Sequence, residues 1–342
     1  MKKLFTAALS LVMSLSLLAA CSSSPAQSGA ASGSGSASGA ASSGSQAKTF
    51  KVAIVQQMDH ASLDEIRTAI ENELTARSND QYTFEFDSFS GQNDATVLNQ
   101  IGSQVVSGGY DAIIPIATLA AQCMATATED TDIPVIYAAI SDPAVAGLEG
   151  IDNVTGTSDA LNTPFILDMM LTADPDVKTV GLLYSNSEPN SATPIADAKA
   201  YLESKGIAYV EKTGNTTDEI LSAANALVGQ VDAVFTPTDN VVMGAAGAVA
   251  EILNEAGIPH YTGADSFVKA GSFATCGVNY TELGAYTADM AADILEGGAI
   301  PAYHVMDGGI ITVNSEAAEK VGIDPSVFSS MAGQVVEVET EQ

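Results

Sequence analysis

The chain alternates short apolar runs with longer segments of helical periodicity. Residues 51–55 (KVAIV) form an unbroken apolar run, which is typical of a strand buried on both faces of a parallel sheet. The segment that follows spaces Leu63, Ile66, Ile70 and Leu74 along one face of a helix. Strands that alternate with helices in this way predict right-handed βαβ units and a parallel sheet covered by helices on both faces.

This alternation is predicted twice, once on each side of a polar stretch at residues 140–159. The stretch reads ISDPAVAGLEGIDNVTGTSD, and its glycines and small polar residues suit a hinge between two packed bodies. Before it, strands are predicted at 82–89, 111–116 and 133–138, and helices at 93–106 and from Thr118 onward. After it, helices are predicted from Thr163 and at 190–204, 217–228, 241–254 and 283–295, and strands at 179–184, 207–210, 231–235 and 258–261, with an extended segment at 272–278. Since 342 residues exceed the roughly 250–300 at which a single core stops growing, we expect two Rossmann-like, doubly wound α/β lobes.

The N-terminus has the layout of a secretory signal. Lys2 and Lys3 precede an uncharged apolar segment at residues 4–20, which ends in Leu-Ala-Ala directly before Cys21. This arrangement resembles the bacterial lipobox, in which the cysteine is lipidated and becomes the first residue of the mature protein. Residues 22–47 are mostly Ser, Gly and Ala, a composition that behaves as a flexible tether. We therefore expect a signal peptide at 1–20 and a lipid-anchored linker at 21–47, with the folded body on the extracytoplasmic face of the cell membrane.

The charge balance limits the kinds of partner. Twelve Lys and Arg residues stand against 42 Asp and Glu residues, which gives a formal net charge of −30. Such a surface repels nucleic acid and anionic membranes, and its simplest explanation is a solvated, highly soluble exterior. The three histidines, at positions 60, 260 and 304, lack metal-ligand spacing. A disulfide between Cys123 and Cys276 is permitted outside the cell, although nothing in the sequence requires it.

The sequence has no motif typical of catalysis or of a bound cofactor. It lacks a G-x-S-x-G nucleophile elbow, an HExxH zinc motif, a Walker A loop and a glycine-rich dinucleotide loop after Val55. We therefore expect a binding protein rather than an enzyme, without a metal ion or cofactor.

The segments that follow the predicted strands are the expected ligand site. In doubly wound sheets, ligands bind outside the carboxyl ends of the strands, and these segments are rich in hydroxyl, amide and carboxyl side chains. They also lead into predicted helix starts, and such a residue taken singly is more often an N-cap than a ligand contact. With Thr157 beside the predicted hinge, the candidate ligand-binding residues are Gln57, His60, Thr118, Ser141, Asp142, Thr157, Ser187, Asn190, Asp239, Asn240 and Asp265.

Several motifs in these segments resemble one family. They are Gln57 with Asp59-His60, Ser141-Asp142-Pro143 with Ala146-Gly147-Leu148, Asn153-Val154-Thr155-Gly156, SEPNS at 187–191, PTDN at 237–240, and GVNY at 277–280 with Leu283-Gly284. Over residues 51–323 the chain resembles the substrate-binding lipoproteins of ABC transporters for tryptophan and other aromatic amino acids. Three positions depart from the family pattern, because Asp59, Ala61 and Cys276 stand where Glu, Pro and an aromatic residue are common.

The resemblance implies a type I periplasmic-binding fold, with a ligand held between two lobes that three hinge crossings connect. The crossings are expected near Gly156, Val278 and Asp307. The N-terminal lobe would comprise residues 48–156 and 279–306, and the C-terminal lobe residues 157–278 and 307–342. The implied protein is a lipid-anchored monomer that clamps an aromatic amino acid, such as tryptophan, phenylalanine or tyrosine, and delivers it to an ABC permease and its ATPase.

The scarcity of basic residues limits how an amino acid can be held. Only two arginines occur, Arg67 and Arg77, both on the first predicted helix and expected to face solvent. A ligand carboxylate is therefore expected to meet backbone N–H groups and hydroxyls at helix starts, with Thr118 and Ser141 as the best candidates.

A ligand ammonium requires an acid, and Asp239 and Asp265 are the candidates because each follows a predicted strand. Two further classes of binding protein stay open. A lipoprotein for sugars or nucleosides would show a pocket of carboxamides and aromatic rings without an acid that faces an amine. A ligand sensor for a membrane receptor would use the same fold without a permease.

Replacing Cys21 with Ala tests the lipid anchor. Labelled fatty acid should no longer be incorporated, because the thiol that receives the lipid is absent from the variant. The measurement is metabolic labelling of the native protein and the variant side by side. Incorporation that survives the substitution would show that Cys21 does not carry the lipid.

Overall fold

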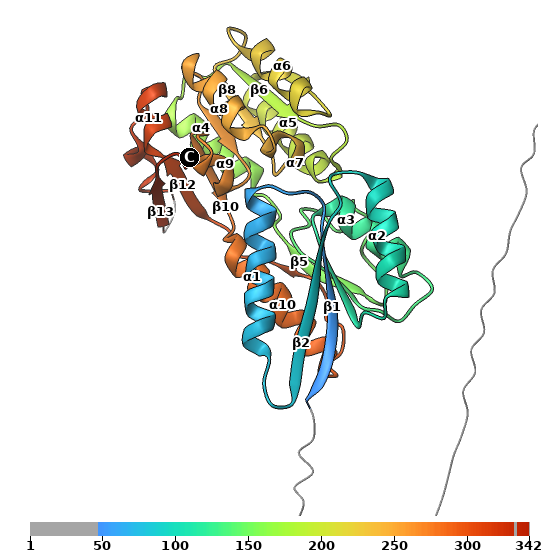
Figure 1. The fold of residues 1–342 in the computed structure, drawn as a ribbon. Helices are drawn as coiled ribbons and strands as arrows, with labels where there is room; N and C mark the ends of the chain where they lie inside the picture. Colours follow the sequence, from blue (N-terminus) through green and yellow to red (C-terminus); the bar gives the residue numbers. More distant parts are fainter. Residues whose placement is uncertain (1–46, 332–333, 342) are drawn as a thin grey trace, which may run out of the picture. The chain divides into compact units, whose positions relative to one another are not determined.

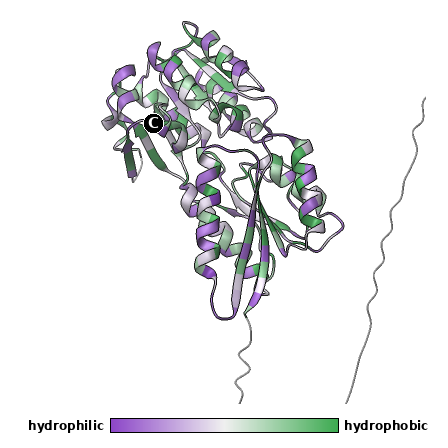
Figure 2. Ribbon diagram, in the orientation of Figure 1, coloured by the Kyte–Doolittle hydropathy of each residue, from purple (hydrophilic) through white to green (hydrophobic). Residues whose placement is uncertain are grey.

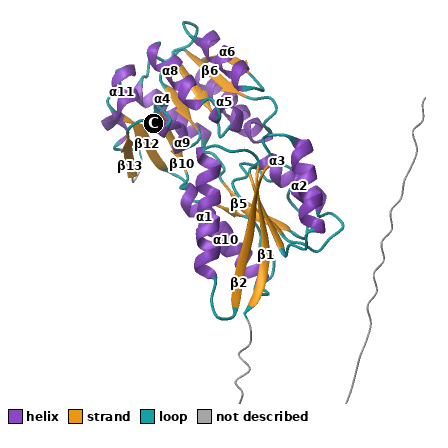
Figure 3. Cartoon of the chain, in the orientation of Figure 1, coloured by secondary structure: helices purple, strands orange, loops and turns teal. Residues whose placement is uncertain are grey.

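The structure is a computed structural model that describes residues 47–331 and 334–341 and contains two sheets (Figures 1 and 3). The first sheet has six strands, all parallel, in the order β11-β5-β4-β3-β1-β2. Its strands are β1 (Lys48–Gln56), β2 (Tyr82–Ser90), β3 (Ala112–Ile116), β4 (Val135–Tyr137), β5 (Val154–Ser158) and β11 (His304–Val305).

The second sheet has seven strands in the order β13-β12-β10-β9-β8-β6-β7. All neighbours are parallel except β10 and β12, which pair antiparallel. Its strands are β6 (Thr179–Tyr184), β7 (Ala208–Thr213), β8 (Ala233–Thr236), β9 (His260–Thr262), β10 (Ala274–Gly277), β12 (Ile310–Asn314) and β13 (Gln334–Val338).

Helices cover both faces of each sheet, which confirms the predicted fold class. On the first sheet, α1 (Ala61–Arg77) and α10 (Tyr280–Leu295) pack together on one face, and α2 (Ala95–Ser107) and α3 (Thr118–Ala127) on the other. On the second sheet, α4 (Thr163–Ala173) and α5 (Ala192–Lys205) pack opposite α6 (Thr217–Leu227) and α8 (Ala246–Glu255). The helices carry alternating hydrophilic and hydrophobic bands, as amphipathic helices on a sheet should (Figure 2). The short elements are α7 (Asn240–Met243), α9 (Asp265–Lys269), α11 (Ser315–Val321) and two 3₁₀ turns, Pro189–Ser191 and Pro325–Phe328.

The two sheets share one winding. Their strands read β2-β1-β3-β4-β5 and β7-β6-β8-β9-β10, so the chain winds outward in both directions from the first and third strands of each sheet. At such a switch point the connections leave toward opposite faces, and a crevice forms at the carboxyl ends of the strands. The segments after β1 and β3, and after β6 and β8, therefore lie where a ligand is expected.

The chain passes between the sheets three times, which confirms the three-crossing hinge. The crossings lie at residues 159–162, between β5 and α4, at residues 278–279, between β10 and α10, and at residues 306–309, between β11 and β12. The predicted end points of the two lobes remain a prediction. The segments at 1–20 and 21–46, which include Cys21, lie outside the described residues.

Two expectations about the local structure are wrong. The stretch 140–159 is not a hinge throughout, because it contains β5, whose five residues are all buried. Its sequence VTGTS is polar, but the Thr157 hydroxyl can be buried because it lies 2.7 Å from that of Thr287 on α10 and so keeps a hydrogen-bond partner. The predicted helix at 241–254 is two helices, α7 and α8, separated at Gly244 and Ala245. Glycine is a poor helix former, and tertiary packing decided the break that periodicity missed.

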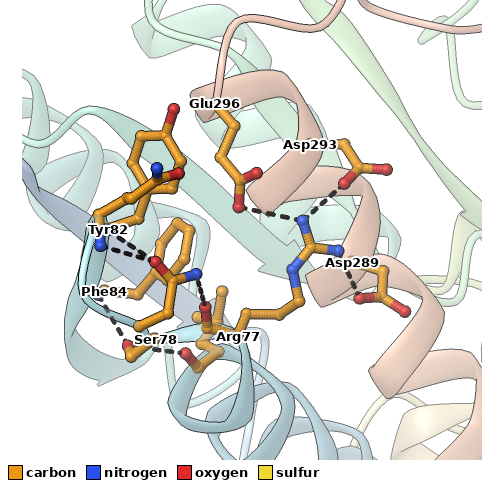
Figure 4. Close-up of polar contacts among 10 residues, drawn as sticks. Arg77, Ser78, Tyr82, Phe84, Asp289, Asp293 and Glu296 are labelled. Atoms are coloured by element: carbon orange, nitrogen blue, oxygen red, sulfur yellow. Dashed lines mark hydrogen bonds and ion pairs between the residues drawn. The ribbon is translucent and has the colours of Figure 1, made fainter.

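Arg77 does not simply face solvent, in contrast to the prediction. It lies at the last residue of α1 and reaches three acids near the end of α10 (Figure 4). Its guanidinium nitrogens lie 2.9 Å from Asp289, 2.7 Å from Asp293 and 3.0 Å from Glu296. Arg67 is likewise committed, with Glu71 at 2.9 Å. Both arginines are therefore paired with acidic side chains of the protein.

Gly156 is a position where the fold requires glycine. It has a φ of 154° within β5, and a Cβ there would overlap the carbonyl oxygen and ring of Tyr137 on β4. Gly147 also has a positive φ, 72°, but a Cβ there would meet nothing within 4 Å. A substitution at Gly147 therefore tests backbone strain alone, and a substitution at Gly156 tests strain together with steric overlap.

Gly156→Ala should lower the free energy of unfolding by about 3 kcal/mol or more, because overlap adds to strain. Gly147→Ala, with strain alone, should lower it by about 1–2 kcal/mol. Urea unfolding of both variants measures the difference. Equal losses would show that β4 and β5 can move apart to accept a methyl group.

Candidate functional site

A pocket lies at the switch points and takes its walls from both sheets. The cavity between these walls is narrow and partly open to solvent, with a volume of about 20 Å³, close to the space that one water molecule needs. The polar lining consists of His60, Ser62, Thr118, Ser141, Asp159, Asn190, Thr238, Asp239, Asn240 and Tyr280. The apolar lining consists of Leu63, Ala117, Ala139, Met243, Ala264 and Phe267. Carboxyl groups line this pocket, and among the described residues no lysine or arginine does.

Two alanines in the wall hold backbone conformations that normally require glycine. Ala117 has φ 73° and ψ 164°, and Ala139 has φ 59°. They follow β3 and β4, which are joined here by a hydrogen bond from Ala117 N to Ala138 O at 3.0 Å. Such conformations cost on the order of 1–3 kcal/mol each and cluster at ligand sites, where the surroundings enforce them. The turn at Ala117 sets Thr118 at the first residue of α3, beside the pocket.

One chain of hydrogen bonds, which we call the Asp159 chain, runs along the pocket wall. The Tyr280 hydroxyl donates to Asp159 Oδ2 at 3.1 Å, and the Ser141 hydroxyl donates to Oδ1 at 3.0 Å. The Ser141 Oγ also lies 3.1 Å from Thr238 Oγ1, and Asn190 Nδ2 donates to the Thr238 carbonyl at 2.6 Å. Asp159 is buried, and its burial raises the pKa of the carboxyl group. Two neutral hydroxyls partner this acid, and the pocket lining offers it no cation.

A second chain, the His60 chain, also joins the two sheets. His60 Nε2 lies 3.0 Å from Asn240 Oδ1, and Asn240 Nδ2 donates to Glu188 Oε2 at 2.6 Å. Gln57 Nε2 donates to Glu188 Oε1 at 2.9 Å, while Gln57 Oε1 accepts from Leu119 N at 3.0 Å. Because Leu119 N can only donate, the orientation of the Gln57 amide is fixed.

Glu188 lies close to a second buried acid, Asp239. Asp239 accepts from Ser185 N at 2.7 Å, Ser191 Oγ at 2.7 Å and Val242 N at 3.0 Å, the last as N-cap of α7. Burial raises the pKa of both carboxyl groups, and the charge of Asp239 raises that of Glu188 further, to about 8. Asp239 has more donors, including two backbone N–H groups, so it is the more readily ionised of the two acids.

Three buried polar atoms of the pocket lining have no hydrogen-bond partner among the described residues. They are His60 Nδ1, Thr118 Oγ1 and Asn190 Oδ1. The starts of α1 and α3 also lack a side-chain cap, whereas α7 and α10 are capped by Asp239 and Asn279. Buried polar groups are normally partnered, so these atoms and helix starts make the pocket a candidate site for a polar ligand.

A second cavity lies behind the Asp159 and Tyr280 side chains, along the three crossings. Its walls include Phe165, Val278 and Cys276. Cys276 is therefore separated from the first pocket by Asp159 and Tyr280, which line both cavities. Both Cys276 and Cys123 are buried free thiols, so the disulfide that the compartment permits does not form.

The structure brings together six of the eleven predicted site residues. The six that line the pocket are His60, Thr118, Ser141, Asn190, Asp239 and Asn240. Gln57 does not line the pocket and is joined to the lining residue Asn240 by two hydrogen bonds, through Glu188. The others do not line this pocket: Asp142 accepts from Thr193 at 2.7 Å, Thr157 contacts Thr287, Ser187 contacts Ser185 at 2.7 Å, and Asp265 pairs with Lys269 at 2.7 Å. Direct ligand contacts for all eleven remain a prediction.

Sequence reasoning missed Asp159 and Tyr280. Asp159 follows β5 directly, which is the same signal that identified the other strand ends, but the sequence pattern predicts a hinge where the structure has β5. Tyr280 was noted only as part of the GVNY motif, and it is the first residue of α10. A strand assignment for 154–158 from its Val and Thr content would have revealed Asp159.

Two doubly wound lobes, three crossings and a pocket at the facing switch points define the type I periplasmic-binding architecture, a class of proteins that bind small molecules. The family model described as ABC transporter substrate binding protein matches residues 51–336. The chain belongs to this family. It is 32% identical over 259 residues to the tyrosine-binding protein of Clostridioides difficile (strain R20291), covering 74% of each chain.

Two solved structures allow a comparison of states. A protein from Streptococcus pneumonia in complex with L-Trp is 32% identical, with a TM-score of 0.77, covering 84% of this chain and all of that one. The ligand-free, open structure of a substrate-binding protein with adhesive properties from Clostridium difficile is 31% identical, with a TM-score of 0.64. The match covers 85% of this chain and 100% of that one. At nearly equal identity, the chain is more similar in structure to the L-Trp complex.

Two further features of the described residues bear on partners other than a small molecule. Across residues 47–331 and 334–341, no helix is long and apolar enough to cross a membrane. The same part of the chain holds no cluster of His, Cys, Asp and Glu side chains placed to bind a metal ion.

Glu188→Gln should flatten the pH dependence of stability. The pKa of Glu188 is raised from 4.5 to about 8, so its protonated form stabilises the folded state. This contribution is complete below about pH 4.5 and is lost as the pH rises toward 8. The midpoint of thermal unfolding of the native protein should therefore fall more between pH 5 and pH 8 than that of the variant.

The matched control is Glu251→Gln, which removes an exposed carboxylate on α8. It should leave the pH profile of the native protein unchanged. Parallel profiles for the native protein and Glu188→Gln would mean that Glu188 is ionised in the folded state.

Proposed function

We propose that this protein binds an aromatic amino acid between its lobes and delivers it to the permease of an ABC importer. ABC substrate-binding proteins are extracytoplasmic. We infer that this one is tethered through a lipid at Cys21 and the linker at 21–47, and that it acts as a monomer without a catalytic step. The observation that carries the ligand class is Asp159, a buried acid in a pocket whose lining supplies no cation.

The ligand ammonium is assigned to Asp159. A buried carboxylate without a cation is costly, and a ligand ammonium removes that cost while it gains charge-assisted hydrogen bonds. Asn190 Oδ1, an unpaired acceptor at the other end of the same chain, supplies a further partner. This assignment favours Asp159 over Asp239, whose carboxylate already accepts three hydrogen bonds, and over Asp265, which is paired with Lys269.

The ligand carboxylate is assigned to the start of α3. This ten-residue helix begins without a side-chain cap, because Ala117 at its N-cap position has no side-chain oxygen. The unpaired Thr118 hydroxyl and the helix N-terminus together favour an anion. Neither arginine lines the pocket, as the sequence led us to expect.

The apolar lining is assigned to the ligand side chain. Leu63, Met243 and Phe267 offer the apolar surface that an aromatic ring requires. Two relatives support the class of ligand, since one is a tyrosine-binding protein and the other was solved with L-Trp. The greater similarity to the L-Trp complex than to the open protein supports a closed arrangement here, as do the side-chain bonds between lobes.

Calorimetric titration tests this proposal. L-Trp, L-Tyr and L-Phe should be compared with glucose, ribose and a nucleoside. At least one aromatic amino acid should bind with micromolar affinity or better, and the sugars and nucleoside should not. Tight binding of a sugar or nucleoside with no response to the amino acids would overturn the proposal.

In the same titrations, Asp159→Asn should weaken binding of the preferred amino acid by more than about tenfold, because the ligand ammonium loses its charged acceptor. Asp239→Asn is the comparison, since it neutralises the other acid of the pocket lining. A larger loss of affinity in Asp239→Asn than in Asp159→Asn would transfer the amine to Asp239.

A further inference from the structure

The His60 ring presents one unpaired nitrogen at the pocket. Nδ1 is shielded from solvent and has no partner among the described residues, while Nε2 is held by Asn240. A buried nitrogen without a partner is costly unless a ligand atom completes it. The question is whether Nδ1 donates or accepts, and which part of the ligand it meets.

The neighbours of His60 set its tautomer. Asn240 Nδ2 donates to Glu188, so Asn240 turns its carbonyl oxygen toward His60. Nε2 must then carry the hydrogen, which leaves Nδ1 with a lone pair and makes it an acceptor. Burial lowers the pKa of His60, which favours the neutral ring that this arrangement requires. Glu188 and Asn240 therefore position the His60 ring at the pocket.

The surroundings of His60 place it beside the ligand side chain rather than the ammonium. His60 is the N-cap residue of α1 and precedes Leu63 by three residues, and Asn240 precedes Met243 by three residues on α7. Both are part of the apolar lining. The Asp159 chain, which is assigned to the ammonium, shares no residue with the His60 chain.

We propose that His60 Nδ1 accepts a hydrogen bond from the ring substituent of the ligand, and so selects tyrosine or tryptophan over phenylalanine. This inference rests on the proposed function. A phenol O–H or an indole N–H can donate to Nδ1, whereas a phenyl ring leaves it buried and unpaired. Sites built to bond such a group reject the analogue that lacks it.

The test combines ligands and variants in calorimetric titrations of L-Trp, L-Tyr, L-Phe and 1-methyl-L-tryptophan, in which the ring N–H is blocked. The native protein should bind L-Phe at least about tenfold more weakly than the better of L-Trp and L-Tyr. If L-Trp binds, its methylated analogue should be weaker by a similar factor. His60→Leu should lose this preference, with L-Phe affinity changed by less than about threefold. His60→Gln should retain it, because its amide can donate to Asn240 and still accept from the ligand.

Thr193→Val is the matched control for lobe closure. It removes the bond from Thr193 to Asp142 between the lobes, and neither residue lines the pocket. Thr193→Val should change the affinity for every aromatic ligand by one common factor. The inference is overturned if His60→Leu also weakens all ligands equally, or if the native protein binds L-Phe as tightly as both others. Should His60→Leu fail to fold, the methylated ligand on the native protein decides. Failure of every aromatic amino acid to bind would instead remove the proposed function, and this inference with it.

Discussion

Parallel strand pairing is the constraint on which the rest of this structure depends. A parallel sheet sets the carboxyl ends of its strands along one edge, and a shared winding order gives each sheet one switch point. Residues as distant in sequence as His60, Thr118 and Asn240 thereby meet in one pocket. The left-handed turns at Ala117 and Ala139 follow from the same constraint, because the chain must leave these strand ends sharply to begin the covering segments.

Burial of acids without basic partners gives the pocket its chemistry. Three carboxyl groups, Asp159, Glu188 and Asp239, are almost fully buried in or beside it, and each is handled differently. Asp239 is stabilised by backbone N–H groups at a helix start, Glu188 by the N–H groups of two side-chain amides, and Asp159 by two hydroxyls and its own backbone N–H group. Because Asp159 accepts from no side-chain amide and lies at no helix start, it is the acid with most to gain from a cation.

The side-chain bonds between the lobes connect ligand binding to closure. The Asp159 chain and the His60 chain each cross from one lobe to the other, and each ends in an unpaired atom at the pocket. A ligand that completes those atoms favours the closed arrangement by its additional contacts there, which is how a clamshell converts binding into a change of population.

The sequence by itself determined the fold class and the strand ends that carry the site. Apolar runs such as 51–55 and 231–235 could be read directly, because a strand buried on both faces has no polar positions. For this reason six of eleven candidates, including His60 and Asn190, do line the pocket. The sequence pattern did not predict β5, because its residues VTGTS are polar. They can be buried because the Thr157 hydroxyl bonds to that of Thr287, which lies 130 residues away in the sequence. The tertiary structure alone decided which polar residues remain unsatisfied. Asp142 and Asp265 look like Asp159 in sequence, but they have found partners in Thr193 and Lys269, and a hydrogen bond between distant segments leaves no local pattern.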